Sequence, residues 1–473
     1  MAAADGRAPA RRRRGALRCQ AVTPRTRELR QLLRLAGPLI LGYVGGQLMG
    51  LVDTAMVGRL GATSLAGVGI GNGIYFTVSC LGIGCVAGME APVAQALGAG
   101  EHERARRLLW QGVRVALGVS LPLMLVTALM PLLLPLAGVD AATSHETRAY
   151  LWARGLNVVP FLLFNAQRCY LQAANVTRPI VLASIAGNLA NVVGNWLFIY
   201  GDAALVRIGL PAIGLPALGV AGSGIASTLA TAAMVLVLAR AVAGIERPPG
   251  REHRRYDPAL VRAILRLGVP MGLQVVAEVG VFATVGVLAG RIGAVAAAAH
   301  QVAIMLASLT FCVTLGIGAA TSVRVGLHIG RHDTPAARSA GLIGLGASAG
   351  FMSLSALLFL LSPRLLASVL TDDAAVIAAA VPLIHVAAIF QISDGLQATA
   401  SGALRGAGDA HAPLWANLVG HWAIGLPVAV ALGFGAHLGA TGLWWGLSLG
   451  LTMVALGLIA RFVRLSSRPI LRV

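Results

Sequence analysis

Long apolar runs alternate with short polar segments along almost the whole chain from about residue 35 onward. Each run exceeds 20 residues, which is the length that a helix needs to cross the hydrocarbon core of a bilayer. Twelve such spans are predicted, at 35–58, 68–90, 114–138, 150–173, 179–201, 213–239, 260–288, 296–322, 338–361, 376–404, 412–436 and 438–463. The pattern therefore predicts an all-α polytopic membrane protein with 12 transmembrane helices.

Composition supports the same class. Of the 473 residues, 57% are apolar and 12% are charged. A soluble domain carries roughly 25% charged residues, so charge is depleted about twofold. These proportions exclude a soluble enzyme, a secreted disulfide scaffold and a disordered chain.

The distribution of basic residues predicts the orientation. The formal net charge is +19, and every one of the 37 basic residues is arginine. Most arginines fall in the segment before the first span and in every second loop, which by the positive-inside rule places both termini in the cytoplasm of a plasma (inner) membrane protein. The arginines lie between apolar runs and not on one folded basic face, so no nucleic-acid partner is expected.

The two halves of the chain repeat. RQLLRLAGP at 30–38 matches RAILRLGVP at 262–270, and VGRLGA at 57–62 matches AGRIGA at 289–294. Parallel repeats of six spans predict two pseudo-symmetric six-helix lobes around a central cleft, where a transporter binds its substrate, although channels and some membrane enzymes also duplicate. The predicted division is an arginine-rich cytoplasmic tail (1–34), an N-terminal lobe (35–240), a cytoplasmic linker (241–259), a C-terminal lobe (260–465) and a second cytoplasmic tail (466–473).

Besides Glu90 at the end of the second span, three carboxylates lie inside predicted spans, where an ionisable group costs roughly 2.5–3.5 kcal/mol at the centre. Glu278 is about midway along the seventh span, with Gln274 one turn earlier. Asp394 lies in the tenth span beside Gln391, and Asp53 lies toward the outer end of the first. They are candidates for ion coupling or cation binding. The alternative is a structural carboxylate that accepts hydrogen bonds from a neighbouring helix.

Other polar residues within the spans have less specific interpretations. Asn188, Asn191 and Asn195 form one helical stripe, which either lines a wet cavity or joins helices. Glu90 is predicted to pair with an arginine of the loop at 104–114. The intramembrane histidines are isolated on separate spans without metal-ligand spacing, and the sequence has no nucleotide-binding P-loop, so no cofactor is expected.

Several segments resemble the multidrug and toxic compound extrusion (MATE) family. They are LVDTAMVGRLGATSLAGVGIG (51–71), EAPVAQALGAG (90–100), RCYLQAANVTRP (168–179), GNLANVVGNWLFIYG (187–201), VRVGLHIG (323–330) and SGALRGAGD (401–409). The likeness covers nearly all of the chain after about residue 30.

This resemblance implies an exporter that expels small organic cations in exchange for protons or sodium, by alternating access of two lobes. Glu278, Asp394 and Asp53 match acidic positions of the NorM-like branch and would be the cation-coupling groups, with a sodium site at Glu278 and Asp394 as the metal alternative. Phe390 stands where some NorM-type members have a tyrosine near the cation site, so that hydroxyl is missing. The candidate substrate cavity comprises Gln274, Phe390, Gln391, Asn188, Asn191 and Asn195.

Alternative functions remain open. A lipid-linked oligosaccharide flippase of the same superfamily would line its cleft with arginines for pyrophosphate, and the predicted cleft offers carboxylates and amides instead. An intramembrane transferase would need clustered aspartate or histidine, and a passive channel would not need buried acids. The expected partners are organic cations and membrane lipids, with the chain acting as a monomer.

Overall fold

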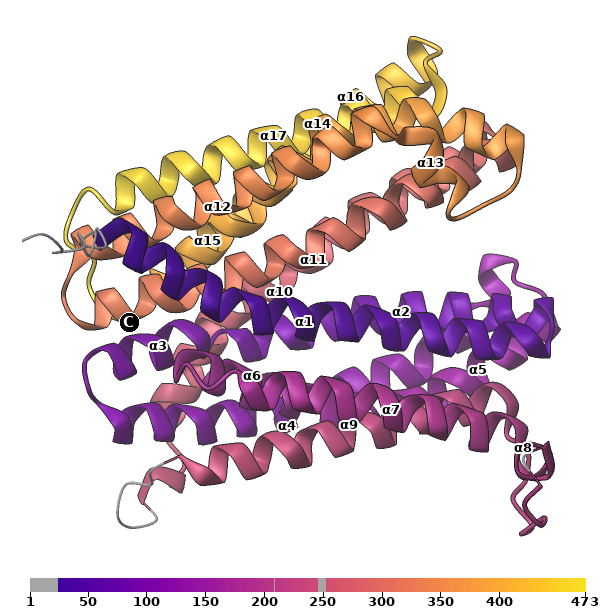
Figure 1. Ribbon diagram of the computed structural model, residues 1–473, viewed down its shortest axis with the longest axis horizontal. Helices are drawn as coiled ribbons and strands as arrows, with labels where there is room; N and C mark the ends of the chain where they lie inside the picture. Colours follow the sequence, from indigo (N-terminus) through magenta and orange to yellow (C-terminus); the bar gives the residue numbers. More distant parts are fainter. Residues whose placement is uncertain (1–23, 208, 246–251) are drawn as a thin grey trace, which may run out of the picture.

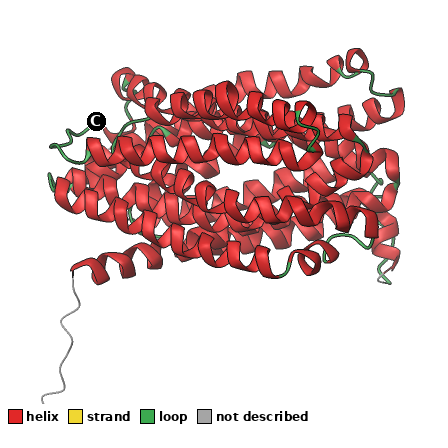
Figure 2. Ribbon diagram, turned by 90° about the horizontal axis from the view of Figure 1, so that it is seen from above, coloured by secondary structure: helices red, strands yellow, loops and turns green. Residues whose placement is uncertain are grey.

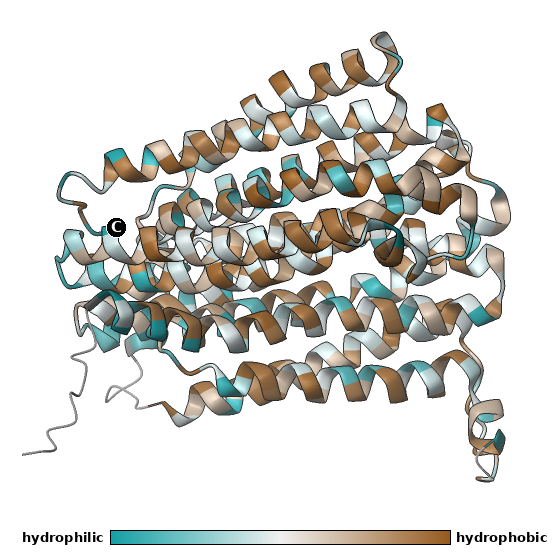
Figure 3. Ribbon diagram, turned by 45° about the horizontal axis from the view of Figure 1, so that its top comes forward, coloured by the Kyte–Doolittle hydropathy of each residue, from teal (hydrophilic) through white to brown (hydrophobic). Residues whose placement is uncertain are grey.

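The computed structural model describes residues 24–207, 209–245 and 252–473, and every regular element in these ranges is a helix (Figure 2). Eleven of the helices in the described residues are long and apolar enough to cross a membrane. Hydrophobic residues dominate along the helices, and hydrophilic residues gather toward the two ends of the bundle (Figure 3). The all-α polytopic class predicted from the sequence is confirmed.

The N-terminal lobe contains the first nine helices. They are α1 (Pro24–Val57), α2 (Ala62–Ala87), α3 (Glu90–Gly98), α4 (His102–Leu129), α5 (Ala141–Gly155), α6 (Val158–Ala173), α7 (Arg178–Tyr200), α8 (Asp202–Arg207) and α9 (Gly219–Gly244). Single 3₁₀ turns lie at Gly58–Leu60, Met130–Leu133 and Pro135–Ala137.

The C-terminal lobe follows a 3₁₀ turn at Glu252–Arg254. Its helices are α10 (Pro258–Ile292), α11 (Ala294–Gly330), α12 (Thr334–Leu361), α13 (Pro363–Ser368), α14 (Ala374–Gly406), α15 (His411–Asn417), α16 (Leu426–Val430) and α17 (Gly439–Leu465). Two π-helical segments, Leu418–Gly425 and Ala431–Gly435, join α15 and α16 into one interrupted helix over the predicted span 412–436.

The fourth predicted span, at 150–173, is divided. α5 ends at Gly155 and α6 starts at Val158, so neither helix alone reaches the length of a span. At the junction, the Asn157 side chain donates a hydrogen bond to the hydroxyl of Tyr75 on α2, at 3.1 Å. The break therefore accounts for eleven long helices where twelve spans were predicted.

Helix ends differ from the predicted boundaries where polar residues extend a helix beyond its apolar run. α1 begins at Pro24, so residues 24–34 of the predicted tail are helical, and residues 1–23 lie outside the described part of the chain.

Four helices are capped by an aspartate that accepts hydrogen bonds from backbone N–H groups of the first turn. These residues are Asp140, Asp257, Asp333 and Asp373.

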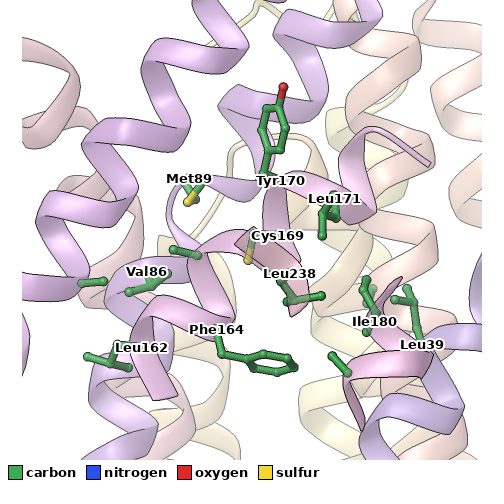
Figure 4. Close-up of a cluster of buried hydrophobic side chains, with 14 of the residues drawn as sticks. Leu39, Val86, Met89, Leu162, Phe164, Cys169, Tyr170, Leu171, Ile180 and Leu238 are labelled. Atoms are coloured by element: carbon green, nitrogen blue, oxygen red, sulfur yellow. The ribbon is translucent and has the colours of Figure 1, made fainter. Parts of the chain in front are cut away.

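Buried apolar side chains form three clusters in the described part of the chain. In the N-terminal lobe, side chains of α1, α2, α6, α7 and α9 meet in the cluster that includes Leu39, Val86, Leu162, Ile180 and Leu238 (Figure 4). The C-terminal lobe has two separate clusters, around Trp444 and around Phe462. Residues of α10 and α11, among them Ile264 and Val323, also belong to the first cluster, so this core extends across the boundary between the lobes.

The lobes touch closely where the C-terminal end of α2 meets the N-terminal half of α10. A Cβ atom at Gly84 would collide with the backbone of Gly272, and one at Gly88 would collide with the backbone of Gly268. These contacts lie toward the end of the bundle where α1 begins and the chain ends, and the α1 and α11 ribbons diverge toward the opposite end (Figure 1). Glycine allows this approach because it has no side chain.

Candidate functional site

Two of the three predicted carboxylates come together in the C-terminal lobe. Glu278 on α10 accepts a hydrogen bond at its Oε2 atom from the side-chain amide of Gln397 on α14, at 3.1 Å. Asp394 lies one turn before Gln397 on the same helix, and the charges of Asp394 and Glu278 act on each other. Gln274, one turn before Glu278, also interacts with its carboxylate. The structure thus places Glu278, Asp394 and Gln274 in one site.

Asp394 is buried without a counterpart. Its side chain is 5% exposed, and no residue in the described ranges donates a hydrogen bond to it or forms an ion pair with it. The Oε1 atom of Gln397 and the hydroxyl of Ser401, both on α14, are also buried without a hydrogen-bond partner. An ionised carboxylate in such surroundings is costly unless a proton or a cation neutralises it.

Glu278 lies at the boundary between the lobes. It is only partly buried, and it follows Gly272, which contacts the backbone of α2, by six residues of α10. At 1.5 Å per residue this separation is about 9 Å along the helix. The site therefore lies just beyond the contact between Gly84 of α2 and Gly272 of α10.

The third carboxylate has a different environment. Asp53, near the end of α1, accepts hydrogen bonds at Oδ1 from Asn191 (2.9 Å) and Asn195 (2.7 Å) of α7. Its Oδ2 atom accepts a hydrogen bond from Ser227 of α9 at 2.7 Å and lies 3.4 Å from Nη1 of Arg154 on α5. Asp53 is thus fully partnered within the N-terminal lobe, and all three asparagines of the predicted stripe join α7 to α1, two of them through Asp53.

Sequence reasoning missed Arg154 and Ser227 in this cluster. Arg154 follows a polar stretch at the start of the predicted span 150–173, and the structure shows it 8% exposed and stacked over the ring of Tyr75, 4.8 Å from its centroid. Ser227 gives no signal in the sequence because serine is common in packed membrane helices. Only the tertiary arrangement of four helices identifies both residues.

The remaining predicted cavity residues lie apart. Asn188 donates hydrogen bonds to the carbonyl groups of Gly45 and of its own helix. Phe390 is 2% exposed and packs edge-on against Phe282 and Trp444, with ring centroids 5.9 Å and 5.6 Å away. Gln391 is fully buried and accepts a hydrogen bond from Ser355 at 2.6 Å.

The predicted partner of Glu90 was wrong. Its Oε2 atom lies 4.0 Å from Nε of Arg405, on α14 of the other lobe. Arginines of the 104–114 segment have other partners: Arg107 pairs with Glu103 within α4, and Arg106 donates to the carbonyl of Val242. Glu90 therefore joins the two lobes, and it lies at the end of the bundle where they touch.

Metal binding has no clustered ligand set in the structure. Among the described residues, no group of three or more histidine, cysteine, aspartate or glutamate side chains is arranged to hold a metal ion. The oxygen atoms of Glu278, Asp394 and Gln397 are the donors that a sodium ion would find in the C-terminal site.

A two-lobed helical bundle with buried, incompletely paired carboxylates is the architecture of a secondary transporter. A protein-family model described as MatE matches residues 38–197 and 270–431. The chain belongs to this family, the one its sequence resembles, and it is a transporter and not an enzyme.

Known proteins of this family are similar over most of the chain. A probable multidrug resistance protein NorM of Deinococcus radiodurans is 38% identical, over 93% of this chain and 96% of that protein. The multidrug resistance protein NorM of Burkholderia vietnamiensis is 34% identical, over 91% and 92%.

Solved structures have the same fold at lower identity. The crystal structure of a eukaryotic MATE transporter is 21% identical, with a TM-score of 0.82 and coverage of 93% of this chain and 96% of that one. An outward-facing multidrug resistance MATE family transporter of the MOP superfamily is 19% identical, with the same TM-score and the same coverage.

Proposed function

We propose that the chain is a secondary active multidrug exporter, which moves organic cations out of the cell in exchange for protons or sodium. The family membership and the names of the NorM relatives support efflux of multiple drugs. The observation that carries ion coupling is the buried, unpartnered carboxylate of Asp394 beside Glu278.

The physical basis of coupling is competition for one negative charge. Two carboxylates of like charge in a medium of low dielectric repel each other, so the pair gains from binding one positive ion. A proton or sodium ion entering from outside neutralises the pair and displaces a bound organic cation. Asp394 suits this role because the described residues give it no competing cation.

Asp53 has a separate part in this proposal. Its four partners, including Arg154, already compensate its charge. We assign it to maintaining the N-terminal lobe in the arrangement described, with cation coupling concentrated at Glu278 and Asp394. That the amide stripe and Phe390 line the substrate path stays a prediction.

Whether the coupling ion is a proton or sodium depends on how many oxygen atoms are free to bind it. A proton requires a single carboxylate oxygen, whereas a sodium ion needs several oxygen ligands. The carboxylates of Glu278 and Asp394 and the unpaired Oε1 atom of Gln397 would supply the first oxygen ligands of a sodium ion. Phe390 contributes no oxygen, since the side chain of phenylalanine has none.

The proposed topology places both termini in the cytoplasm of the plasma (inner) membrane. It is supported by the arginine distribution and by the position of both described ends at the same end of the bundle (Figure 1). The lobes then touch at the cytoplasmic end, which is the outward-open arrangement of alternating access. One chain carries both lobes, so we propose that a monomer is sufficient.

The test is efflux of a fluorescent lipophilic cation from cells that lack their own pumps. Wild type is compared with Glu278→Gln, Asp394→Asn and the control Asp372→Asn, which changes an exposed carboxylate between α13 and α14. A proton gradient and a sodium gradient are imposed separately. We expect wild type and control to export the dye under one gradient, and both site variants to lose at least tenfold of the rate.

Each outcome distinguishes the alternatives. Retained efflux in both site variants, with normal amounts in the membrane, would refute the coupling assignment. Absence of wild-type efflux under either gradient would favour the lipid-linked oligosaccharide flippase. Electrical conductance without a counter-gradient would indicate a channel.

A further inference from the structure

A cavity lined by arginines lies at the end of the bundle where α1 begins. Its volume is about 700 Å³. Its lining comprises Gln31, Arg34, Leu35, Pro38, Asn175, Val176, Thr177, Arg178 and Arg324. These residues come from the first turns of α1, the turn between α6 and α7, the start of α7, and α11 of the other lobe. This cavity is separate from the carboxylates at Glu278 and Asp394.

Two of its three arginines have free charges. Arg324 is paired with Glu28, at 2.6 and 2.7 Å. Arg34 and Arg178 are exposed, and no residue in the described ranges forms an ion pair with either. No carboxylate lines the cavity. The positive charges of Arg34 and Arg178 therefore attract an anion that carries one or two negative charges.

The arginines lie at the depth of lipid headgroups. The apolar run of α1 starts at Leu35, directly after Arg34, and that of α7 starts directly after Arg178. Arg324 follows the apolar run of α11 by two residues. Three arginines from three helices thus surround one cavity at the boundary between the hydrocarbon core and the polar region.

The remaining lining has the amphipathic character of a lipid. Leu35, Pro38 and Val176 offer an apolar wall, whereas Asn175 and Thr177 add neutral hydrogen-bonding groups. Guanidinium groups bind phosphate oxygens through paired hydrogen bonds, and basic pockets between helices at a membrane surface bind anionic headgroups. A free phosphate would not use the apolar wall.

We propose that this cavity binds the phosphate headgroup of an anionic phospholipid, held mainly by Arg34 and Arg178. Because Arg324 belongs to the C-terminal lobe and the two free arginines to the N-terminal lobe, the bound lipid contacts both lobes. The proposal does not depend on the coupling ion or on the transported substrate, so its failure and that of the proposed function are distinguishable.

The test is a lipid titration of the purified full-length protein in detergent, followed by native mass spectrometry. The probe is dioleoyl-phosphatidylglycerol, and the measured quantity is the Kd of the first bound lipid. Dioleoyl-phosphatidylcholine tests the need for net negative charge, and inorganic phosphate as a competitor tests a free anion as the ligand.

The variant is Arg34→Gln with Arg178→Gln, and its control is Arg240→Gln with Arg331→Gln. The control removes two exposed arginines that lie beyond apolar runs at this end of the bundle but do not line the cavity. At about 1 kcal/mol per arginine, we expect roughly thirtyfold weaker binding in the cavity variant. The control should bind as wild type does. The pair Arg34→Lys with Arg178→Lys retains charge and should recover part of the affinity.

Four results would overturn the proposal. They are an unchanged Kd in the cavity variant, an equal loss in the control, equal affinity for phosphatidylcholine, and displacement of the lipid by inorganic phosphate at comparable concentration. Recovery of affinity by the lysine pair supports the proposal even where the glutamine pair loses folded protein.

Discussion

The contact between Glu28 and Arg324 offers a direct test of how the lobes are held together. Glu28 lies on α1 of the N-terminal lobe, and Arg324 lies on α11 of the C-terminal lobe. Two hydrogen bonds of 2.7 and 2.6 Å join the guanidinium to the carboxylate, and His328 adds a third contact at 3.4 Å. Both paired side chains are nearly buried, at 9% and 12% exposure. This ion pair is therefore shielded from water while the lobes touch.

Glu28→Gln keeps the shape but removes the negative charge. A charge-assisted pair of this kind contributes about 2–3 kcal/mol, because the guanidinium would otherwise remain desolvated and unpaired. When the lobes separate at this end, water reaches Arg324 and the loss is offset. The substitution therefore destabilises the touching arrangement alone, and its population relative to the separated one should fall roughly 30- to 150-fold.

The assay is a spin-label distance measurement between Arg240→Cys on α9 and Arg331→Cys after α11, in a chain without native cysteines. Glu28→Gln should shift the distance distribution to longer values. Glu103→Gln is the matched control, because its pair with Arg107 is exposed and lies within α4. An identical distribution in both variants would refute the claim that the Glu28 pair holds the lobes together.

Two further predictions concern stability within one lobe and at one loop. Asp53→Asn leaves Arg154 buried without a charge partner, so the free energy of unfolding should fall by about 3–5 kcal/mol, as measured by thermal unfolding in detergent. The control is the helix-cap change Asp140→Asn, which should be nearly neutral because asparagine caps equally well. Backbone N–H groups of residues 213–215, with that of 213 the strongest, hold the pKa of Asp202 below its usual value. A lowered pKa stabilises the loop at neutral pH, and this stabilisation is lost as the pH falls through that pKa. Hydrogen exchange at 213–215 should therefore be faster in Asp202→Asn than in wild type at neutral pH, and a difference that persists unchanged in acid would contradict the assignment.

Much of the fold could be predicted because the apolar runs report directly on burial in lipid. The first span is an informative exception, since α1 begins at Pro24 and extends through arginines that the hydropathy pattern assigns to a tail. Those residues are helical because the first turns contact the other lobe, as Glu28 does. In residues 24–34 the helix therefore follows tertiary contact and not local hydropathy.

The site was predictable to the extent that one helix determines it. Asn191 and Asn195 share a face with regular spacing, and the structure places both against Asp53. The fourth partner of Asp53, Arg154, comes from another helix and has no periodic relation to these asparagines. Glu90 shows the same limit, because its partner Arg405 lies in the other half of the sequence while nearer arginines were the obvious choice.

The glycine contact between α2 and α10 also determines how far a given rotation moves the distant end. From Gly272 to the end of α10 at Ile292 is 20 residues, or about 30 Å of helix. Turning α10 about that contact by roughly 20° moves its far end by about 10 Å, which is wider than one α-helix backbone and comparable to the width of a helix with its side chains. Smooth backbone surfaces at the pivot need no side chains to repack during such a turn. A small rotation of α10 about this contact therefore produces a large displacement at the opposite membrane face.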